Sequence, residues 1–205
     1  SFHAQASRGL QIESLGASVL LVLDRLGLYH AQVVETTGVA GRNLVGGTAG
    51  AVAVLLVVLE ALAVVGVWVL YARARDLRGR LPVAFAAAVA GFIAFTKVFS
   101  PQYLVWLLPL VVVAGNVVAV ALAAVALVLA QVWFFHYHAL FRVAWPVWLL
   151  VARDLVMVAL YLALAASLAR WKIRMPSRSK TSRHSGFRRS QESWSAVGKG
   201  ASRSA

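Results

Sequence analysis

The 205-residue sequence contains no cysteine and few charged residues. Without cysteine, the chain can form neither disulfides nor thiolate metal sites. Charged residues make up 13% of the chain and hydrophobic residues 61%, an apolar share well above that of an ordinary soluble domain. The mean hydropathy is +0.79. Because there is too little charge to cover the surface of a soluble globule, we expect a protein that is surrounded by lipid.

Several chemical motifs are missing as well. The sequence has no Gly-rich phosphate loop, zinc motif or nucleophile elbow. His136 and His138 are separated by one residue, which does not suit one face of a helix, and no third ligand lies near them in the sequence. We therefore expect no metal ion and no other cofactor.

The net charge of +13 is concentrated in two basic segments. Ten of the twenty Lys and Arg residues lie from Arg170 onward, and four more lie between Arg73 and Arg80. No folded nucleic-acid reader accompanies this charge, so we expect no nucleic-acid partner. Basic residues beside a membrane span attract anionic lipids and stay in the cytoplasm. Both segments, and with them the C-terminus, are therefore predicted to be cytoplasmic.

Apolar stretches of membrane-spanning length follow one another along the chain. A helix needs roughly 20 apolar residues to cross a bilayer, and four stretches approach or exceed that length: residues 47–72, 81–99, 116–135 and 148–168. A shorter apolar segment, 103–114, lies between the second and the third. Because the two basic segments belong on one side, the number of crossings between them must be even. The short segment is therefore predicted to cross too.

These stretches predict an all-α, polytopic membrane protein with about five transmembrane helices. Residues 1–46 are expected to form an external region. From residue 29 onward it is predicted to be a loop, and before that residue it is predicted to contain an amphipathic helix. The apolar residues of this helix recur at helical spacing, which predicts that it lies in the membrane interface: Ile12, Leu15, Val19, Val22 and Leu26. Residues 47–170 form the transmembrane region. Residues 171–205 are expected to be a disordered basic tail, because they have too little apolar surface to offset the entropy of ordering.

Polar side chains gather where the second predicted span ends, in the segment FTKVFSPQYLVWLLPL. Lys97, Ser100, Gln102 and Tyr103 place a cation, two hydroxyls and an amide at one membrane face. A point charge and an amide donor suit an anionic group such as a lipid phosphate, and a helix that starts at Tyr103 would add amide donors. The alternative is a snorkelling lysine beside a proline turn.

A second polar group, within RGLQIES, leads into the predicted external helix. Arg8 could bind a phosphate or a saccharide, and Glu13 together with Gln11 could orient that bound group. The alternative is a helix cap with an exposed salt bridge, which contributes little to stability.

Three further charges lie inside the predicted spans. Glu60 is in the middle of the first span, and the sequence identifies no partner for it. Arg153 and Asp154 are adjacent, so they project about 100° apart on a helix. We expect them not to face each other, and to pair instead with another helix or with headgroups.

Three of these segments together resemble a known family. RGLQIES with the apolar helix after it, TKVFSPQYLVWLLPL, and the closing span that begins LLVARDLVMVAL are similar to the C-terminal half of bacterial glycosyltransferase family 87 proteins, over about residues 8–172. These proteins belong to the GT-C class and look like polyprenyl-phosphate-mannose-dependent mannosyltransferases. Where such proteins often show Arg-Asn, this chain has Arg153 and Asp154.

The resemblance implies a hexosyltransferase of the bacterial plasma membrane with its active site on the outer face. The donor is then a sugar, expected to be mannose, on a polyprenyl phosphate, and the acceptor is a glycolipid or polysaccharide. The family's catalytic acid belongs to a first external loop, which nothing in this sequence matches. The catalytic residue is therefore unknown, and we expect the chain to be the C-terminal part of a longer enzyme, inactive alone.

Within that expectation, two groups of residues share the binding. The donor phosphate and lipid are expected to contact a set of polar side chains: Lys97, Ser100, Gln102, Tyr103 and Arg8. Gln11 and Glu13 are expected to orient the acceptor.

Two other classes of protein fit the same residues. A small transporter or channel subunit would use Glu60 and Lys97 as its intramembrane charges, although the inverted repeats that many transporters show are not visible in the sequence. A structural membrane protein without catalysis would use every charge as a topological anchor.

Overall fold

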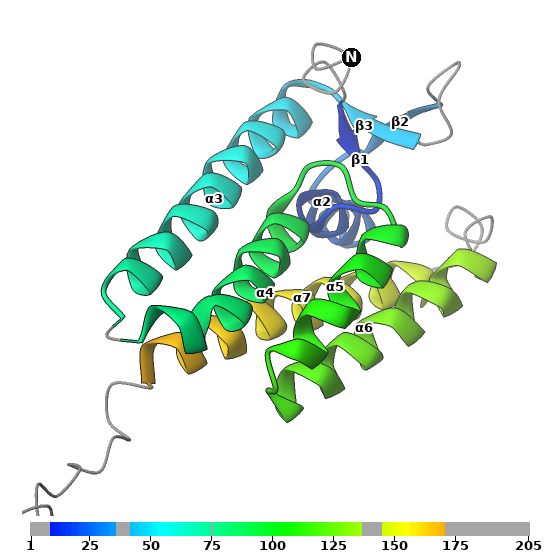
Figure 1. The fold of residues 1–205 in the computed structure, drawn as a ribbon. Helices are drawn as coiled ribbons and strands as arrows, with labels where there is room; N and C mark the ends of the chain where they lie inside the picture. Colours follow the sequence, from blue (N-terminus) through cyan, green and yellow to red (C-terminus); the bar gives the residue numbers. More distant parts are fainter. Residues whose placement is uncertain (1–8, 36–41, 75, 137–144, 171–205) are drawn as a thin grey trace, which may run out of the picture. The chain divides into compact units, whose positions relative to one another are not determined.

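The computed structural model describes residues 9–35, 42–74, 76–136 and 145–170, which are mostly helical (Figure 1). A small region of one helix and three strands comes first, in the order β1 (Leu10–Gln11), α2 (Leu15–Arg25), β2 (Gln32–Glu35) and β3 (Arg42–Val45). Five helices follow: α3 (Gly47–Ala72), α4 (Leu77–Phe95), α5 (Gln102–Val113), α6 (Val117–His136) and α7 (Trp145–Arg170). Arg8 and the predicted disordered tail lie outside the described residues.

Four of these helices are long and apolar enough to cross a membrane, namely α3, α4, α6 and α7. The prediction of a membrane protein is therefore supported by the length and composition of its helices. α5 has 12 residues and rises roughly 18 Å, less than the roughly 30 Å of a hydrocarbon core. The fifth crossing stays a prediction.

A three-stranded antiparallel sheet departs from the all-α expectation. Its strand order is β1-β3-β2, with Leu44 of β3 opposite both Leu10 of β1 and Val33 of β2. The loop predicted from residue 29 onward was wrong over β2 and β3. These strands have four residues each, too few for an alternating pattern to be distinguished from a loop.

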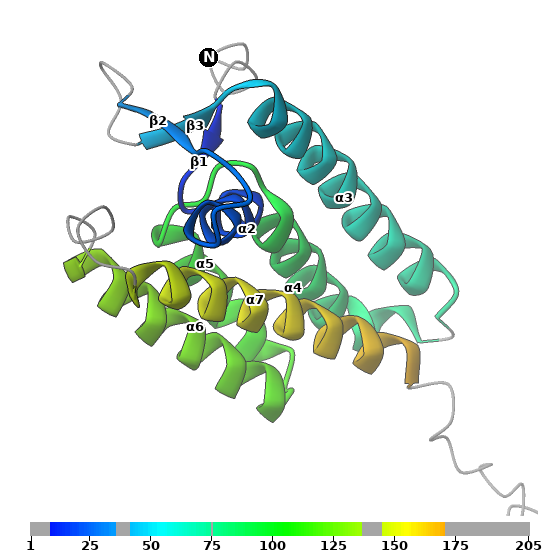
Figure 2. The ribbon, with the colours of Figure 1, turned by 180° about the vertical axis from the view of Figure 1, so that it is seen from behind.

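The helix that the sequence predicts for the membrane interface is α2, and it packs against other helices of the described fold. Its place relative to the membrane stays a prediction. α2 lies against α3 and α7 (Figure 2), and it buries Ala17, Leu20 and Leu21. A Cβ atom on Gly16 would lie 2.4 Å from Val52 Cγ1, so glycine permits the close approach of α2 to α3. Val19, which belongs to the apolar series expected to share one face, is 51% exposed instead. α2 is therefore a packed helix of the fold.

Two hydrogen bonds show which ends of the helices lie together. Arg80 Nη1 donates to the Leu168 carbonyl at 3.1 Å, which places the start of α4 beside the end of α7. At the other end, the Gln11 amide donates to the Lys97 carbonyl at 3.1 Å, which joins β1 to the turn after α4. The start of α4 and the end of α7 share one end of the bundle, as the positive charges predict. Which membrane side that end occupies stays a prediction.

Small residues let the central helix α4 pack closely. Its buried positions include Ala86, Ala87 and Ala90, which face α7 and the other helices of the bundle. A Cβ atom on Gly91 would lie 2.9 Å from the Tyr161 ring and 3.2 Å from Ala63 Cβ. The Tyr161 hydroxyl donates to the Ala63 carbonyl at 3.2 Å. In lipid, the hydrophobic effect does not drive helices together, because the lipid tails are themselves apolar. Close packing of small residues then stabilises the contact between helices.

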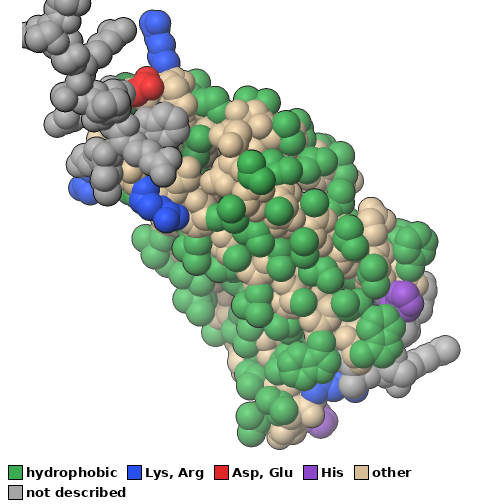
Figure 3. Space-filling view, turned by 90° about the horizontal axis from the view of Figure 1, so that it is seen from below, with side chains coloured by type: hydrophobic (Ala, Val, Ile, Leu, Met, Phe, Trp, Pro, Cys, Tyr) green, Lys and Arg blue, Asp and Glu red, His purple; other side chains and the backbone are tan. Residues whose placement is uncertain are grey.

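The surface is consistent with lipid on all sides of the bundle. On the face shown in Figure 3, hydrophobic side chains cover the middle and the Lys and Arg side chains lie toward the ends. Large apolar side chains on several helices are exposed, Trp68, Trp106 and Leu155 among them. A soluble monomer rarely exposes apolar patches of this extent.

The absence of cysteine makes the predicted topology directly testable. Ser100 lies in the turn after α4 and Arg170 ends α7 at the opposite end. We expect the variant Ser100→Cys to react with a membrane-impermeant maleimide from one side of sealed vesicles only. The variant Arg170→Cys should react from the other side only. The parent chain is the blank for labelling. Reaction of both cysteines from the same side would contradict the arrangement of α4 and α7.

Candidate functional site

A buried ion pair lies near the start of α7. The Arg153 guanidinium is fully buried and donates to Asp154 Oδ1 from Nε at 3.0 Å and from Nη2 at 2.7 Å. The prediction that these neighbours do not face each other was wrong. Their Cβ directions do diverge on the helix, but the long arginine side chain turns back and brings its charge to the adjacent carboxylate.

The same guanidinium joins two other parts of the chain. Arg153 Nη2 donates to the backbone carbonyl of Glu13, just before α2. The guanidinium carbon lies 4.0 Å from the centre of the Phe99 ring, within the range of a cation–π interaction. α7 is therefore linked through one side chain to the start of α2 and to the turn after α4.

Glu13 forms the opposite side of this buried cluster. Its side chain is buried, and its Oε1 accepts a hydrogen bond from Trp133 Nε1 of α6 at 3.1 Å. Burial raises the pKa of Glu13 above its usual value, while the Trp133 hydrogen bond and the Arg153 charge oppose that shift. Because the carboxyl lies inside the fold, it is not presented at the surface as an acceptor-orienting group would be.

The turn after α4 presents the remaining polar side chains. α4 ends at Phe95, so residues 96–101 leave the helix before α5 begins at Gln102. Phe99 is buried against Arg153, whereas Gln102 is exposed and Lys97, Ser100 and Tyr103 are half-buried. The buried ring thus anchors a turn whose polar side chains stay accessible.

Two of the amide donors that the sequence suggested at the start of α5 are hydrogen-bonded within the turn itself. The Tyr103 amide donates to the Ser100 carbonyl at 3.0 Å and the Leu104 amide to the Pro101 carbonyl at 3.1 Å. These two groups are already used within the turn. An anion at this place would therefore depend mainly on the side chains of the turn.

Lys97 interacts electrostatically with Glu60 in the middle of α3. Glu60 is half-buried, and Lys97 lies near enough to act on its charge. The two charges come from α3 and from the turn after α4, and the whole of α4 lies between these two segments in the sequence.

The residues predicted for a site are partly brought together. Gln11 meets Lys97 through the backbone, and the Gln11 Oε1 atom is buried with no hydrogen-bond partner among the described residues. Glu13 lies in the buried cluster, and Arg8 is outside the described part of the chain. Sequence reasoning missed Phe99 and Trp133, because neither differs by type from the other aromatic residues of the spans.

The part of the chain that the structure describes holds no group of three or more His, Asp or Glu side chains that could bind a metal ion. His136 Nδ1 lies 2.8 Å from the Val132 carbonyl, and its ring packs on Trp145 with centroids 4.7 Å apart. These local contacts account for the described member of the H-x-H pair. His138 lies outside the described residues.

Comparisons with protein-family models, with curated proteins and with solved structures find no match for this chain. The resemblance to glycosyltransferase family 87 therefore stays an expectation from the sequence motifs. The geometry adds a buried ionic cluster beneath an accessible turn with one cation, two hydroxyls and one amide. Charge-assisted hydrogen bonds from such side chains can bind an anionic group.

Removing the buried cation tests the cluster. In Arg153→Met, Asp154 is left buried without its counter-charge, so we expect the free energy of unfolding in detergent to fall by about 3–5 kcal/mol. Replacing both partners, as Arg153→Met with Asp154→Leu, should recover most of that loss. Equal stability of Arg153→Met and the parent chain, measured by denaturant titration, would contradict the role of the pair.

The raised pKa of Glu13 predicts a pH dependence. A carboxyl whose pKa is raised by folding stabilises the fold while it is protonated, and this contribution is lost as the pH rises through the folded-state pKa. Glu13→Gln keeps the acceptor for Trp133 without the charge. As the pH increases above 4.5, the ordinary pKa, the variant's unfolding temperature should therefore rise relative to that of the parent chain.

Glu35→Gln is the matched control, because Glu35 lies at the surface in an ion pair with Arg42. Because a surface ion pair contributes little to stability, the rise of the unfolding temperature relative to the parent chain that is expected of Glu13→Gln should be absent from Glu35→Gln. A constant difference between Glu13→Gln and the parent chain at every pH would refute the assigned shift.

Proposed function

We propose that this chain is the C-terminal part of a membrane glycosyltransferase of the GT-C type, which transfers a sugar from a polyprenyl phosphate to a glycolipid or polysaccharide. The sugar is mannose in the proteins that the chain resembles. One observation carries the proposal: the three segments of the resemblance, far apart in the sequence, touch one another. Gln11 bonds to Lys97, and Arg153 contacts both Glu13 and Phe99.

The accessible turn is the donor-binding part in this proposal. Lys97 provides the charge for the donor phosphate, and Ser100, Gln102 and Tyr103 provide hydrogen bonds to it. Charge-assisted hydrogen bonds of this kind are stronger than neutral ones. Arg8 is assigned to the same phosphate by the resemblance alone.

The buried residues act on this turn indirectly. Arg153 holds Phe99 and the Glu13 carbonyl, so the turn and the start of α2 are fixed to α7. Glu13 and Gln11 are then positioning residues, and the acceptor-orienting role expected from the sequence would require them to be reached from the surface. The catalytic acid is proposed to lie in an external loop of a longer chain, as the resemblance implies.

A transfer assay tests the donor site. Membranes that contain the product of the whole reading frame are given a radiolabelled polyprenyl-phosphate sugar, and transfer to lipid or polysaccharide is measured. Loss of a charge-assisted hydrogen bond costs about 1.5–3 kcal/mol, so Lys97→Ala should lower kcat/KM for the donor roughly 10- to 100-fold. Arg25→Ala, an exposed cation at the end of α2, is the control and should leave transfer unchanged.

A variant of Glu60 distinguishes donor binding by Lys97 from a structural or transport role of the two charges. If Lys97 binds the phosphate, Glu60 competes for its charge, so Glu60→Gln should lower the KM for the donor while Lys97→Ala raises it. If the two charges serve each other only, both variants should lose stability and neither should change the donor KM. That second result, or full transfer by Lys97→Ala, would remove Lys97 from the donor site.

A further inference from the structure

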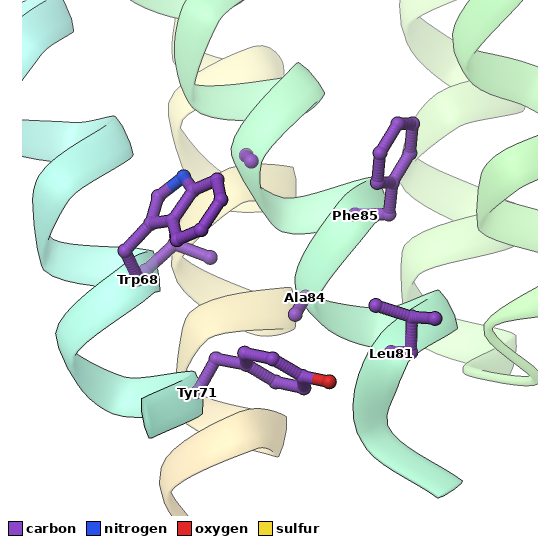
Figure 4. Close-up of a pocket in the computed structure, with 7 residues that line it drawn as sticks. Trp68, Tyr71, Leu81, Ala84 and Phe85 are labelled. Carbon is purple, nitrogen blue, oxygen red and sulfur yellow. The ribbon is translucent and has the colours of Figure 1, made fainter. Parts of the chain in front are cut away.

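An apolar groove lies between α3 and α4, close to the turn that joins them. Its lining comes from two stretches of helix: Val67, Trp68 and Tyr71 of α3, and Leu81, Ala84, Phe85 and Ala88 of α4. The rings of Trp68 and Tyr71 point from α3 toward α4 in Figure 4. Val67 and Ala84 are buried, whereas Trp68 is 67% and Phe85 59% exposed. The groove therefore has a closed floor and is open toward the lipid side.

The size of the groove suits a chain segment better than a compact ligand. Its volume is about 200 Å³, the space of roughly seven groups the size of a water molecule. Sites for drug-sized ligands and cofactors are larger, roughly 300–1,000 Å³. A row of methylene groups fits both the volume and the wholly apolar lining.

A basic turn closes the groove at one end. Leu81, Phe85 and Ala88 follow one another on α4 at spacings of three and four residues, and Arg78 continues this row one turn earlier. Arg78 is exposed, as is Arg73, which caps the end of α3. Helical side chains lean toward the helix N-terminus, so Arg78 leans out of the membrane, away from the apolar part of the groove.

The other polar groups of this turn are used internally. The Asp76 carboxylate accepts the Gly79 amide at 3.1 Å, and the Tyr71 hydroxyl donates to the Leu77 carbonyl at 3.0 Å. Arg80 is buried and donates to the Leu168 carbonyl of α7. Arg73 and Arg78 are thus the exposed cations of the described part of this turn, and each lies in the sequence within three residues of a residue that lines the groove.

We propose that this groove binds one anionic phospholipid, with a segment of an acyl chain between Trp68 and Phe85 and the headgroup phosphate at Arg78 and Arg73. The charge of the turn selects an anionic headgroup over a zwitterionic one, and the groove holds the chain next to it. The site is distinct from the polar turn at the other end of α4, and it does not depend on sugar transfer.

Native mass spectrometry of the full chain, purified in mild detergent, tests this site. The protein is incubated with equal amounts of phosphatidylglycerol and phosphatidylcholine, and retained lipid is counted. The parent chain should retain phosphatidylglycerol preferentially. Removing one arginine near an anionic headgroup weakens attraction by about fivefold in affinity, so Arg78→Gln should lower the ratio of the two bound lipids by about that factor. Arg170→Gln, an exposed cation at the same end, is the matched control.

The chain-binding half of the site is tested separately. Ala88→Phe fills the groove and should lower retention of both lipids, whereas Ala124→Phe, on the exposed face of α6, should not. Trp68→Ala removes one wall and replaces Ala88→Phe if the latter lowers the unfolding temperature. Equal retention of the two lipids by the parent chain, equal effects of Arg78→Gln and Arg170→Gln, or unchanged retention after the groove variants would each overturn the proposal.

Discussion

The buried guanidinium of Arg153 is the constraint on which the end of the fold that contains β1 and the turn after α4 depends. A cation in an apolar interior is costly unless hydrogen bonds and an opposite charge compensate for its lost hydration. Arg153 obtains these from Asp154 on its own helix and from the backbone carbonyl of Glu13, with the Phe99 ring beside it. Satisfying one charge therefore fixes the start of α2 and the turn after α4 against α7.

This constraint separates two kinds of polar residue at the same end of the bundle. Glu13 and Asp154 are buried and engaged with Trp133 and Arg153, so their contribution to any function is to hold geometry. Lys97 and the side chains after it remain at or near the surface. In the proposed function, a donor phosphate would contact the accessible side chains, and the buried residues would hold those side chains in position. Pre-organisation of a binding site by a buried shell of this kind is a general means of keeping it precise.

At the opposite end of the bundle, one arginine is buried and another is exposed. Arg80 is buried and donates to a carbonyl at the end of α7, which joins the start of α4 to the end of α7. Arg78, only two residues earlier, is exposed beside an apolar groove. Arginine is thus buried in a contact between two helices at one position and exposed at the other, because successive helical positions point in different directions.

The sequence alone determined the four long apolar helices and the shared end of Arg80 and Arg170, because helix length, hydropathy and charge placement are local properties of the chain. It also marked Lys97 and Glu60 as costly charges within or beside a span. Only the tertiary structure decided their partners, the return of Arg153 onto Asp154, and the sheet that pairs β1 with β3 across more than thirty residues. Those contacts join distant segments, and no periodicity within a segment specifies which distant side chain will satisfy a buried polar group.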